Sequence, residues 1–206
     1  MIEVVGLFVY PIKSCAATTL TAAEIGPRGI RGDREWLVIS STNEFLTQRE
    51  CPRLALVRPT LTDDGVRLEA KGVPTLHVPI DRQGIKRRVL IWRDECDSID
   101  QGDDVAEWLS EQIGQSCRLV RMADDFVRTV NPQYATSAAD QVGFADGYPL
   151  LLISEESLTD LNSRLVQPLP MNRFRPNLVI AGAGGSFVED RILSLQVGDV
   201  TFHAVK

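Results

Sequence analysis

Residues 66–92, VRLEAKGVPTLHVPIDRQGIKRRVLIW, contain three short runs rich in apolar residues. The runs are residues 66–70, 76–80 and 87–92, and they are divided by Lys71-Gly72 and Gln83-Gly84. Short runs at this spacing, separated by turn-forming residues, are typical of β-sandwiches and β-barrels. This stretch therefore predicts a mainly β fold for the first half of the chain.

The same pattern extends toward the N-terminus. Further strands are predicted at residues 4–10, 36–39 and 54–57, with Gly26-Pro27 and Thr42-Asn43 as turns between them. A doubly wound parallel sheet has strands that alternate with helices along the chain, and this half of the chain shows no such alternation. We therefore expect a sandwich or a barrel.

A helix is predicted after these strands. Its apolar residues recur at helical spacing on one face and are Val105, Trp108, Leu109 and Ile113. Asp104, followed three residues later by Glu107, resembles a capping box, and Gly114 can end the helix. This segment is the first predicted helix of the chain.

The second half of the chain is of mixed type. Strands are predicted at residues 118–121, 150–153 and 177–181, a helix at 155–165 with Ser154 as N-cap and Leu158, Leu161 and Leu165 facing a core, and a hairpin from 192–195 and 200–202. Apolar periodicity lapses between residues 123 and 141, so we expect two domains, residues 1–120 and 121–206. The predicted fold class is mainly β with some helix (α+β).

Composition narrows the function classes. The chain has 206 residues, 22 Lys and Arg against 28 Asp and Glu, and a net charge of −6. Nucleic-acid binders use an excess of cations to displace counterions, so we expect no nucleic-acid polymer as a partner. No apolar run reaches the about 20 residues that span a bilayer, and no basic stretch precedes an apolar core at the start. We therefore expect no membrane partner and a cytoplasmic location.

The cysteines are too far apart for a metal motif. Cys15, Cys51, Cys96 and Cys117 include no Cys-x-x-Cys pair and have no histidine at ligand spacing. Without a secretory signal, cysteines at such spacing are interpreted as free thiols. Neither a disulfide framework nor a zinc site is expected.

Two segments of the first half carry candidate anion-binding groups. In residues 10–15, YPIKSC, Pro11 fixes the backbone so that Lys13 and Ser14 could point together at an anion such as a phosphate. The alternative is a solvent-facing lysine beside a small buried cysteine. In residues 32–36, GDREW, Arg34 could offer a planar fork to a phosphate, or it could form a surface pair of little energetic value with Asp33 or Glu35.

The sharpest local feature is NRFRPN at residues 172–177. In an extended segment Arg173 and Arg175 would share a face, and Pro176 keeps Arg175 out of the helical region. A phosphorylated ligand would satisfy the two like charges, and Asn177 could add an amide. Salt bridges to acids of the protein itself are the alternative.

A turn at residues 146–149, DGYP, leads into the predicted strand at 150–153. It could contact a ligand or could serve only as a turn. Residues 47–50, TQRE, are polar like residues 32–36, and there a surface pair of little energetic value is favoured over a ligand contact.

Taken together, six segments resemble one known family. They are residues 10–15 (YPIKSC), 32–36 (GDREW), 46–50 (LTQRE) with 52–54 (PRL), 144–150 (FADGYPL), 154–165 and 172–177 (NRFRPN). In this order they are similar to the MOSC-domain proteins of the YcbX and mitochondrial amidoxime-reducing component type. The resemblance implies an N-terminal MOSC β-barrel domain, residues 1–120, followed by the N-terminal part of a MOSC domain, residues 121–206.

The resemblance also implies a cofactor and a reaction. Family members bind a molybdenum cofactor (Mo-molybdopterin) and reduce N-hydroxylated compounds, including hydroxylated nucleobases and amidoximes, with electrons from an iron-sulfur or flavin partner. By motif matching, the cofactor-binding residues are Lys13, Ser14, Arg34, Arg175 and Asn177. Pyridoxal phosphate binding, also described for the family's domains, would use the same kind of cationic site, but no Schiff-base lysine is indicated.

The resemblance leaves the metal ligand and the catalytic residues unassigned. In the family, a cysteine that ligates molybdenum follows the strand matching residues 200–205, and the sequence ends at Lys206. We expect that position to lie beyond this sequence, and Cys15 occupies a different motif position. A non-catalytic carrier of molybdopterin or another phosphate ligand, or a sulfur-delivery module, is the alternative function. A third possibility is an incomplete barrel without a function of its own, because unpaired strand edges associate.

Overall fold

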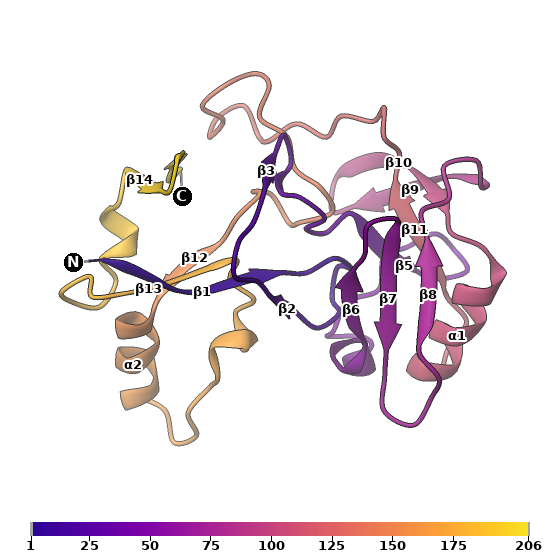
Figure 1. Ribbon diagram of the computed structural model, residues 1–206, viewed down its shortest axis with the longest axis horizontal. Coiled ribbons are helices and arrows are strands. Elements are labelled where there is room, and N and C mark those ends of the chain that lie inside the picture. Colours follow the sequence, from indigo (N-terminus) through magenta and orange to yellow (C-terminus); the bar gives the residue numbers. More distant parts are fainter. Residues whose placement is uncertain (1, 206) are drawn as a thin grey trace.

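The structure of the chain is a computed structural model, which describes residues 2–205 (Figure 1). Met1 and Lys206, the outermost residues of the two predicted domains, lie outside the described residues. The strands are β1 (Glu3–Val9), β2 (Thr18–Thr19), β3 (Ile25–Gly26), β4 (Gly29–Ile30), β5 (Trp36–Ile39), β6 (Arg58–Leu61), β7 (Gly65–Glu69), β8 (Leu76–Pro79), β9 (Lys86–Ile91), β10 (Asp94–Asp100), β11 (Arg118–Met122), β12 (Leu152–Ser154), β13 (Leu178–Ala181), β14 (Ser194–Val197) and β15 (Val200–His203). The helices are α1 (Asp103–Ile113) and α2 (Glu155–Ser163), with short 3-10 helices η1 (Pro52–Leu56), η2 (Met171–Arg173) and η3 (Glu189–Arg191). The predicted mainly β fold with some helix is confirmed.

The main core surrounds the sheet β5-β11-β10-β9. Strand β5 is buried on both faces, since Trp36 and Val38 belong to one hydrophobic cluster and Leu37 and Ile39 to another. Successive strand side chains point to opposite faces, so a strand that is apolar throughout must be covered on both sides. Residues of β7, β8, η1 and α1 also belong to the first cluster.

Helix α1 ends as predicted but begins differently. Gly114 has a left-handed backbone with φ 78°, and its N–H donates to the carbonyl of Ser110. The predicted capping box is wrong, because Gly102 is the N-cap and no side chain caps the helix. Asp104 instead lies in the first turn, where its charge favours the positive end of the helix dipole.

The strand predicted at residues 54–57 is also wrong. Residues Pro52–Leu56 form η1, with Pro52 in its first turn. A proline suits this position because its fixed φ is helical and its missing N–H would have no partner. Leu54 and Val57 are still fully buried, at the three-residue spacing of a 3-10 helix rather than at strand spacing.

A second sheet, β12-β13-β1-β2, joins the two ends of the chain. Strands β12 and β13 are parallel, with α2 in the connection between them, and β1 is antiparallel to β13. The predicted N-cap is confirmed, since Ser154 Oγ accepts a 3.1 Å hydrogen bond from the Ser157 N–H. Helix α2 ends at Ser163, so the predicted core position of Leu165 is wrong and that side chain is exposed.

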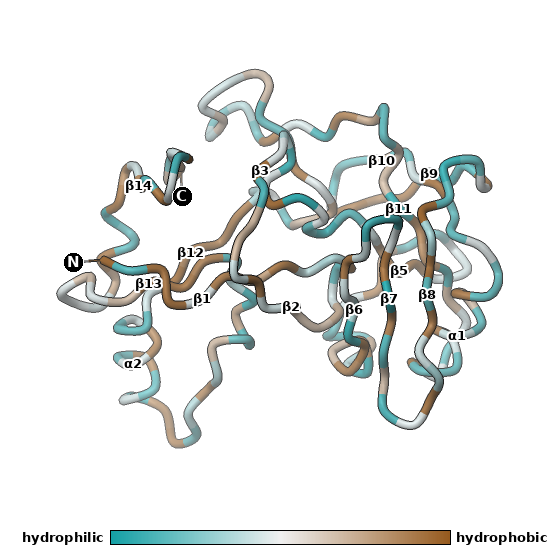
Figure 2. The backbone as a smooth tube through the Cα atoms, viewed as in Figure 1, coloured by the Kyte–Doolittle hydropathy of each residue, from teal (hydrophilic) through white to brown (hydrophobic). Residues whose placement is uncertain are grey.

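Strand β1, from the first half of the chain, pairs with β13 from the second half (Figure 1). The division into two domains near residue 120 stays a prediction. Strand β1 belongs to the first predicted domain by its sequence position but pairs with a strand of the second. The β14–β15 hairpin is confirmed. Figure 2 shows hydrophobic residues along β1, β12 and β13 as well as along the strands of the main core. In the described part of the chain, no helix is long and apolar enough to cross a membrane.

Candidate functional site

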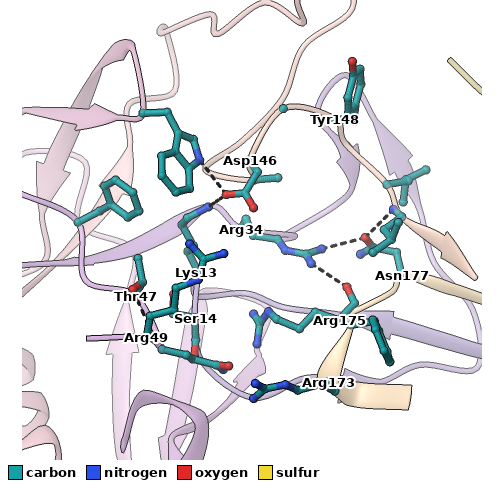
Figure 3. Close-up of a pocket in the computed structure, with 18 residues that line it drawn as sticks. Lys13, Ser14, Arg34, Thr47, Arg49, Asp146, Tyr148, Arg173, Arg175 and Asn177 are labelled. Atoms are coloured by element: carbon teal, nitrogen blue, oxygen red, sulfur yellow. Dashed lines mark hydrogen bonds and ion pairs between the residues drawn. The ribbon is translucent and has the colours of Figure 1, made fainter. Parts of the chain in front are cut away.

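A cavity of about 500 Å³ lies where the loops of the two sheets converge. All five residues predicted to bind a cofactor line this cavity: Lys13, Ser14, Arg34, Arg175 and Asn177. They come from the end of β1, the approach to β5 and the approach to β13, which are far apart in sequence (Figure 3). The volume is within the range of ligand-binding pockets.

The backbone around the cavity is strained. Ser14, Arg34, Trp92 and Arg175 have φ values of 70°, 48°, 56° and 60°, and all four line the cavity. A positive φ costs a non-glycine residue of order 1 kcal/mol or more, and such residues cluster at functional sites. The extended segment predicted around Arg173 and Arg175 is therefore wrong: η2 precedes a left-handed residue, and both side chains nevertheless reach the cavity.

Arg34 is held by a buried network. Its Nη1 donates to Asp33 Oδ2 at 2.5 Å and to Asn177 Oδ1 at 2.8 Å, and its Nη2 donates to the carbonyl of Arg175 at 3.1 Å. The pair with Asp33 had been considered as a surface contact, but only 1% of the Asp33 side chain is exposed. Burial raises the pKa of Asp33, although the Arg34 charge opposes that rise. The pair between Arg34 and Asp33 is therefore a buried contact and not a surface one, and the network holds the Arg34 guanidinium in one position.

Asn177 connects the two sheets. Its Nδ2 donates to the carbonyl of Phe8 at 3.2 Å and to Asp33 Oδ1 at 3.0 Å. Its Oδ1 accepts hydrogen bonds from Arg34 Nη1 and from the Leu151 N–H. Both amide hydrogens are used within the protein, so this geometry gives Asn177 a positioning role at the cavity wall.

Lys13 is paired inside the cavity. Its Nζ donates to Asp146 Oδ1 at 2.6 Å and to the carbonyl of Phe144 at 2.8 Å. Burial lowers the pKa of Lys13, and the Asp146 charge opposes this. Burial alone would raise the pKa of Asp146, but the Lys13 charge and the hydrogen bonds from Lys13 and Trp92 hold it below its usual value. The loop at residues 146–149, for which a ligand contact had been one interpretation, thus supplies the counter-ion of Lys13.

Tyr10 lies against two guanidinium groups. The Arg34 and Arg175 Cζ atoms are 4.2 Å and 4.3 Å from its ring centroid, and its hydroxyl donates to the carbonyl of Pro176. Such cation–π contacts hold planar cations in place. Burial raises the pKa of Tyr10, although both arginine charges oppose the shift.

Arg175 carries an unsatisfied donor. Its Nη1 donates to the carbonyl of Cys15 at 2.6 Å, whereas its Nη2 is buried and has no hydrogen-bond partner among the described residues. Burial, and then the charge of Arg34, lower the pKa of Arg175. A buried donor without an acceptor costs about 1–3 kcal/mol, and more for a charged group, so an acceptor is the missing component here.

Several lining residues were missed or undervalued in the sequence. Arg49 lies in the segment at 47–50 that had been interpreted as solvated, and Gln48 Nε2 donates to the carbonyl of Ser14 at 2.7 Å. Phe45 and Trp92 stack edge to face with their centroids 5.2 Å apart. Residues 46–50 are one of the six segments that carry the family resemblance. That resemblance is the only sign in the sequence that this segment contributes to the site. Phe45 and Trp92 gave none, because their place depends on long-range packing.

The cysteines do not supply a metal ligand in this cavity. All four are free and buried, and Cys15 is the one beside the cavity. Burial raises the pKa of Cys15 to about 12, which keeps the thiol protonated at neutral pH. Within residues 2–205, no group of three or more His, Cys, Asp or Glu side chains is arranged to hold a metal ion.

Comparison with known proteins identifies the two parts of the chain. Residues 1–116 match the MOSC N-terminal beta barrel domain, and residues 139–206 match the MOSC domain. Mitochondrial amidoxime-reducing component 1 is 37% identical in Mus musculus and 33% identical in Homo sapiens; each alignment covers 97% of this chain and 61% of the relative. Molybdenum cofactor sulfurase of Danio rerio is 28% identical over 97% of this chain and 26% of that protein. The chain thus spans about three-fifths of the amidoxime-reducing components it matches.

Proposed function

Because the chain belongs to the MOSC family, we propose that it binds a molybdenum cofactor in the cavity and takes part in reducing N-hydroxylated compounds. The names of its relatives support both parts of this proposal, since they include amidoxime-reducing components and molybdenum cofactor sulfurases. When bound, the cofactor would supply a metal that takes oxygen from the N–O bond of the substrate. The electron donor would be an iron-sulfur or flavin protein.

The observation that carries the proposal is the unsatisfied Nη2 of Arg175. The pterin of this cofactor ends in a phosphate, which is an acceptor for charge-assisted hydrogen bonds from arginine. Such a group would satisfy the buried donor and would reduce the repulsion between Arg34 and Arg175. The residues present therefore fit the phosphate end of the cofactor.

The residues divide into direct donors and positioning residues. Arg175 would bind the phosphate through Nη2, and Lys13 has a third ammonium hydrogen beyond those donated to Asp146 and Phe144. The Ser14 hydroxyl lines the same cavity. Asn177 would act indirectly, by fixing Arg34 through its Oδ1.

A second function is favoured by one specific observation. The only thiol beside the cavity, among the described residues, is Cys15, and its raised pKa makes it a poor metal ligand. A carrier of molybdopterin, or a sulfur-delivery module, would need the phosphate site without turnover, and the name of the molybdenum cofactor sulfurase that this chain resembles is compatible with either. Retention of the cofactor without reductase activity would favour this alternative.

The test is the cofactor content of the purified chain. Molybdenum is measured by mass spectrometry, and pterin by its fluorescence after oxidation, in the wild type, in Arg175→Gln and in Arg58→Gln, an exposed control on β6 outside the cavity. We expect Arg175→Gln to hold about tenfold less cofactor, because it loses charge-assisted hydrogen bonds, and Arg58→Gln to match the wild type. Equal contents in all three proteins, or none in the wild type, would contradict cofactor binding. Reduction of an N-hydroxylated nucleobase by the loaded chain separates the reductase from the carrier.

A further inference from the structure

The cavity concentrates positive charge in an acidic protein. Its charged lining residues are the cations Lys13, Arg34, Arg49, Arg173 and Arg175 and the anion Asp146. The whole chain carries a net charge of −6. Like charges gather in this way at a cost in mutual repulsion, and an anionic ligand removes that cost.

These cations differ in whether the protein already neutralises them. Arg34 is paired with Asp33, and Lys13 with Asp146. The guanidinium groups of Arg49 and Arg173 have no hydrogen-bond or ion-pair partner in the part of the chain that the structure describes. The unpaired charge of the cavity therefore resides on Arg49, Arg173 and Arg175, and the first two are not among the five residues predicted to bind the cofactor.

Arg49 and Arg173 reach the cavity from two separate segments. The backbone of Arg49 is held in a turn, where its N–H donates to Thr47 Oγ1 at 3.2 Å. Arg173 ends the short helix η2. In Figure 3 Arg49 comes from one side of the cavity, and Arg173 and Arg175 come from the other. Arg49 and Arg173 thus bring two cations to the same cavity from different segments of the chain.

One phosphate does not account for all of these groups. A phosphomonoester carries about −1.5 to −2 charges at pH 7. The proposed cofactor phosphate is assigned to Arg175 and Lys13, and Arg49 and Arg173 remain beyond it.

We propose that Arg49 and Arg173 form a second anion subsite, which binds a second phosphate group within the same cavity. The proposal rests on the proposed function for the identity of the first phosphate. The second phosphate has two possible sources with the same chemistry. It belongs either to a nucleotide attached to the pterin or to a substrate that is a phosphorylated N-hydroxylated nucleoside.

The first experiment counts phosphate sites on the full chain. Isothermal titration with inorganic phosphate at low salt is carried out, after any bound cofactor has been removed, on the full chain as wild type, Arg49→Gln/Arg173→Gln, Arg175→Gln and the control Arg58→Gln. We expect two sites in the wild type and in the control, and one in the double variant, with affinity for the lost site at least tenfold weaker. Arg175→Gln should lose the other site. A wild type with a single site that the double variant leaves unchanged would overturn the second subsite, whereas cofactor retained by Arg175→Gln would overturn the proposed function separately.

The second experiment identifies the source of the phosphate. If it belongs to the substrate, cytidine 5′-monophosphate should bind the wild type at least tenfold more tightly than cytidine, and the double variant should lose this preference. If it belongs to the cofactor, the pterin released from the wild type should carry a nucleotide by mass spectrometry, and the double variant should hold less of it. A double variant that matches the wild type in both measurements overturns the proposal.

Discussion

Strands β5 and β1 are both rich in apolar residues, but they differ in how much of each strand is buried. All four residues of β5 are buried between two hydrophobic clusters. In β1 only Val9 is buried, while Val4 and Val5, at the other end, are 41% and 48% exposed. Burial along β1 thus increases toward the cavity, where the chain continues into the buried residue Tyr10.

The difference in burial indicates which region stabilises the fold and which region forms the ligand site. Apolar burial is the dominant favourable term in folding, and the part of the chain from β5 to β11 holds most of the residues of the two clusters. The sheet that contains β1 contributes Arg175 and Asn177 on the loop before β13, which complete the cavity. The first region is therefore expected to determine the unfolding free energy, and the junction between the regions to determine ligand binding.

The strongest test of this comparison is a truncation in each region. Leu119 on β11 is fully buried, whereas Leu193, just before β14, is 81% exposed. We expect Leu119→Ala to lower the unfolding free energy by about 3 kcal/mol, through lost transfer energy and a cavity, and Leu193→Ala by less than about 0.5 kcal/mol. Urea denaturation with constant slopes would measure both values. Similar losses at the two positions would remove the distinction between the regions.

A buried charge in the first region gives an effect of similar size. Asp100 on β10 accepts hydrogen bonds from Arg87, from Arg118 through two nitrogens and from the Gly102 N–H. Burial alone would raise the pKa of Asp100, but these hydrogen bonds and the Arg118 charge hold it below its usual value. Asp100→Asn leaves both arginines without their shared carboxylate, so we expect a loss of about 3 kcal/mol at pH 7.

The loss at Asp100 should depend on pH in one direction. A carboxyl whose pKa is lower in the folded state stabilises the protein above its unfolded pKa of about 4, and this stabilisation fades as the pH falls through the folded pKa. The difference in urea midpoint between wild type and Asp100→Asn should therefore be full at pH 7 and smaller at pH 3. A difference that grows toward pH 3 would contradict the direction of the shift.

Local sequence patterns predicted much of both regions, since their signals act within a few residues. The strand Trp36–Ile39, the cap by Ser154 and the stop at Gly114 each follow from neighbouring residues. Strand β10, DECDSID, was missed because its polar residues are buried by partners from other elements. The strand expected at 54–57 failed because Pro52 favours a helical turn.

The candidate site was predictable where its chemistry is visible in single residues. Lys13, Arg34 and Arg175 are cations beside prolines or turns, and they do line one cavity. The buried pairing of Arg34 with Asp33 was not predictable, since it depends on Asn177 from the other end of the chain. Which arginines remain unpaired is therefore a property of the fold and not of the motifs.

A cut between the regions should have a smaller effect. Residues 131–140 are mostly exposed, whereas β11, near the proposed division at residue 120, is almost fully buried. We expect limited digestion with thermolysin to cut first within 131–140, and the two fragments to elute together from a sizing column because β1 stays paired with β13. Mass spectrometry locates the cut. Fragments that separate, or a first cut inside β11, would show that the regions are less connected than β1 indicates.

The smallest effect distinguishes backbone strain at the cavity from an ordinary helix. Ser14 has φ 70°, so Ser14→Gly removes the strain and the hydroxyl, while Ser14→Ala removes the hydroxyl alone. We expect the glycine variant to be more stable than the alanine variant by about 1 kcal/mol, since only glycine adopts this region without steric cost. Ser110, inside α1, is the matched control, and there alanine should be more stable than glycine by about 1 kcal/mol because glycine is a poor helix former. Thermal and urea unfolding of the four variants give the two differences. Opposite signs at the two positions locate stored strain at the cavity, whereas the same sign at both would mean that Ser14 relaxes to an ordinary backbone in solution.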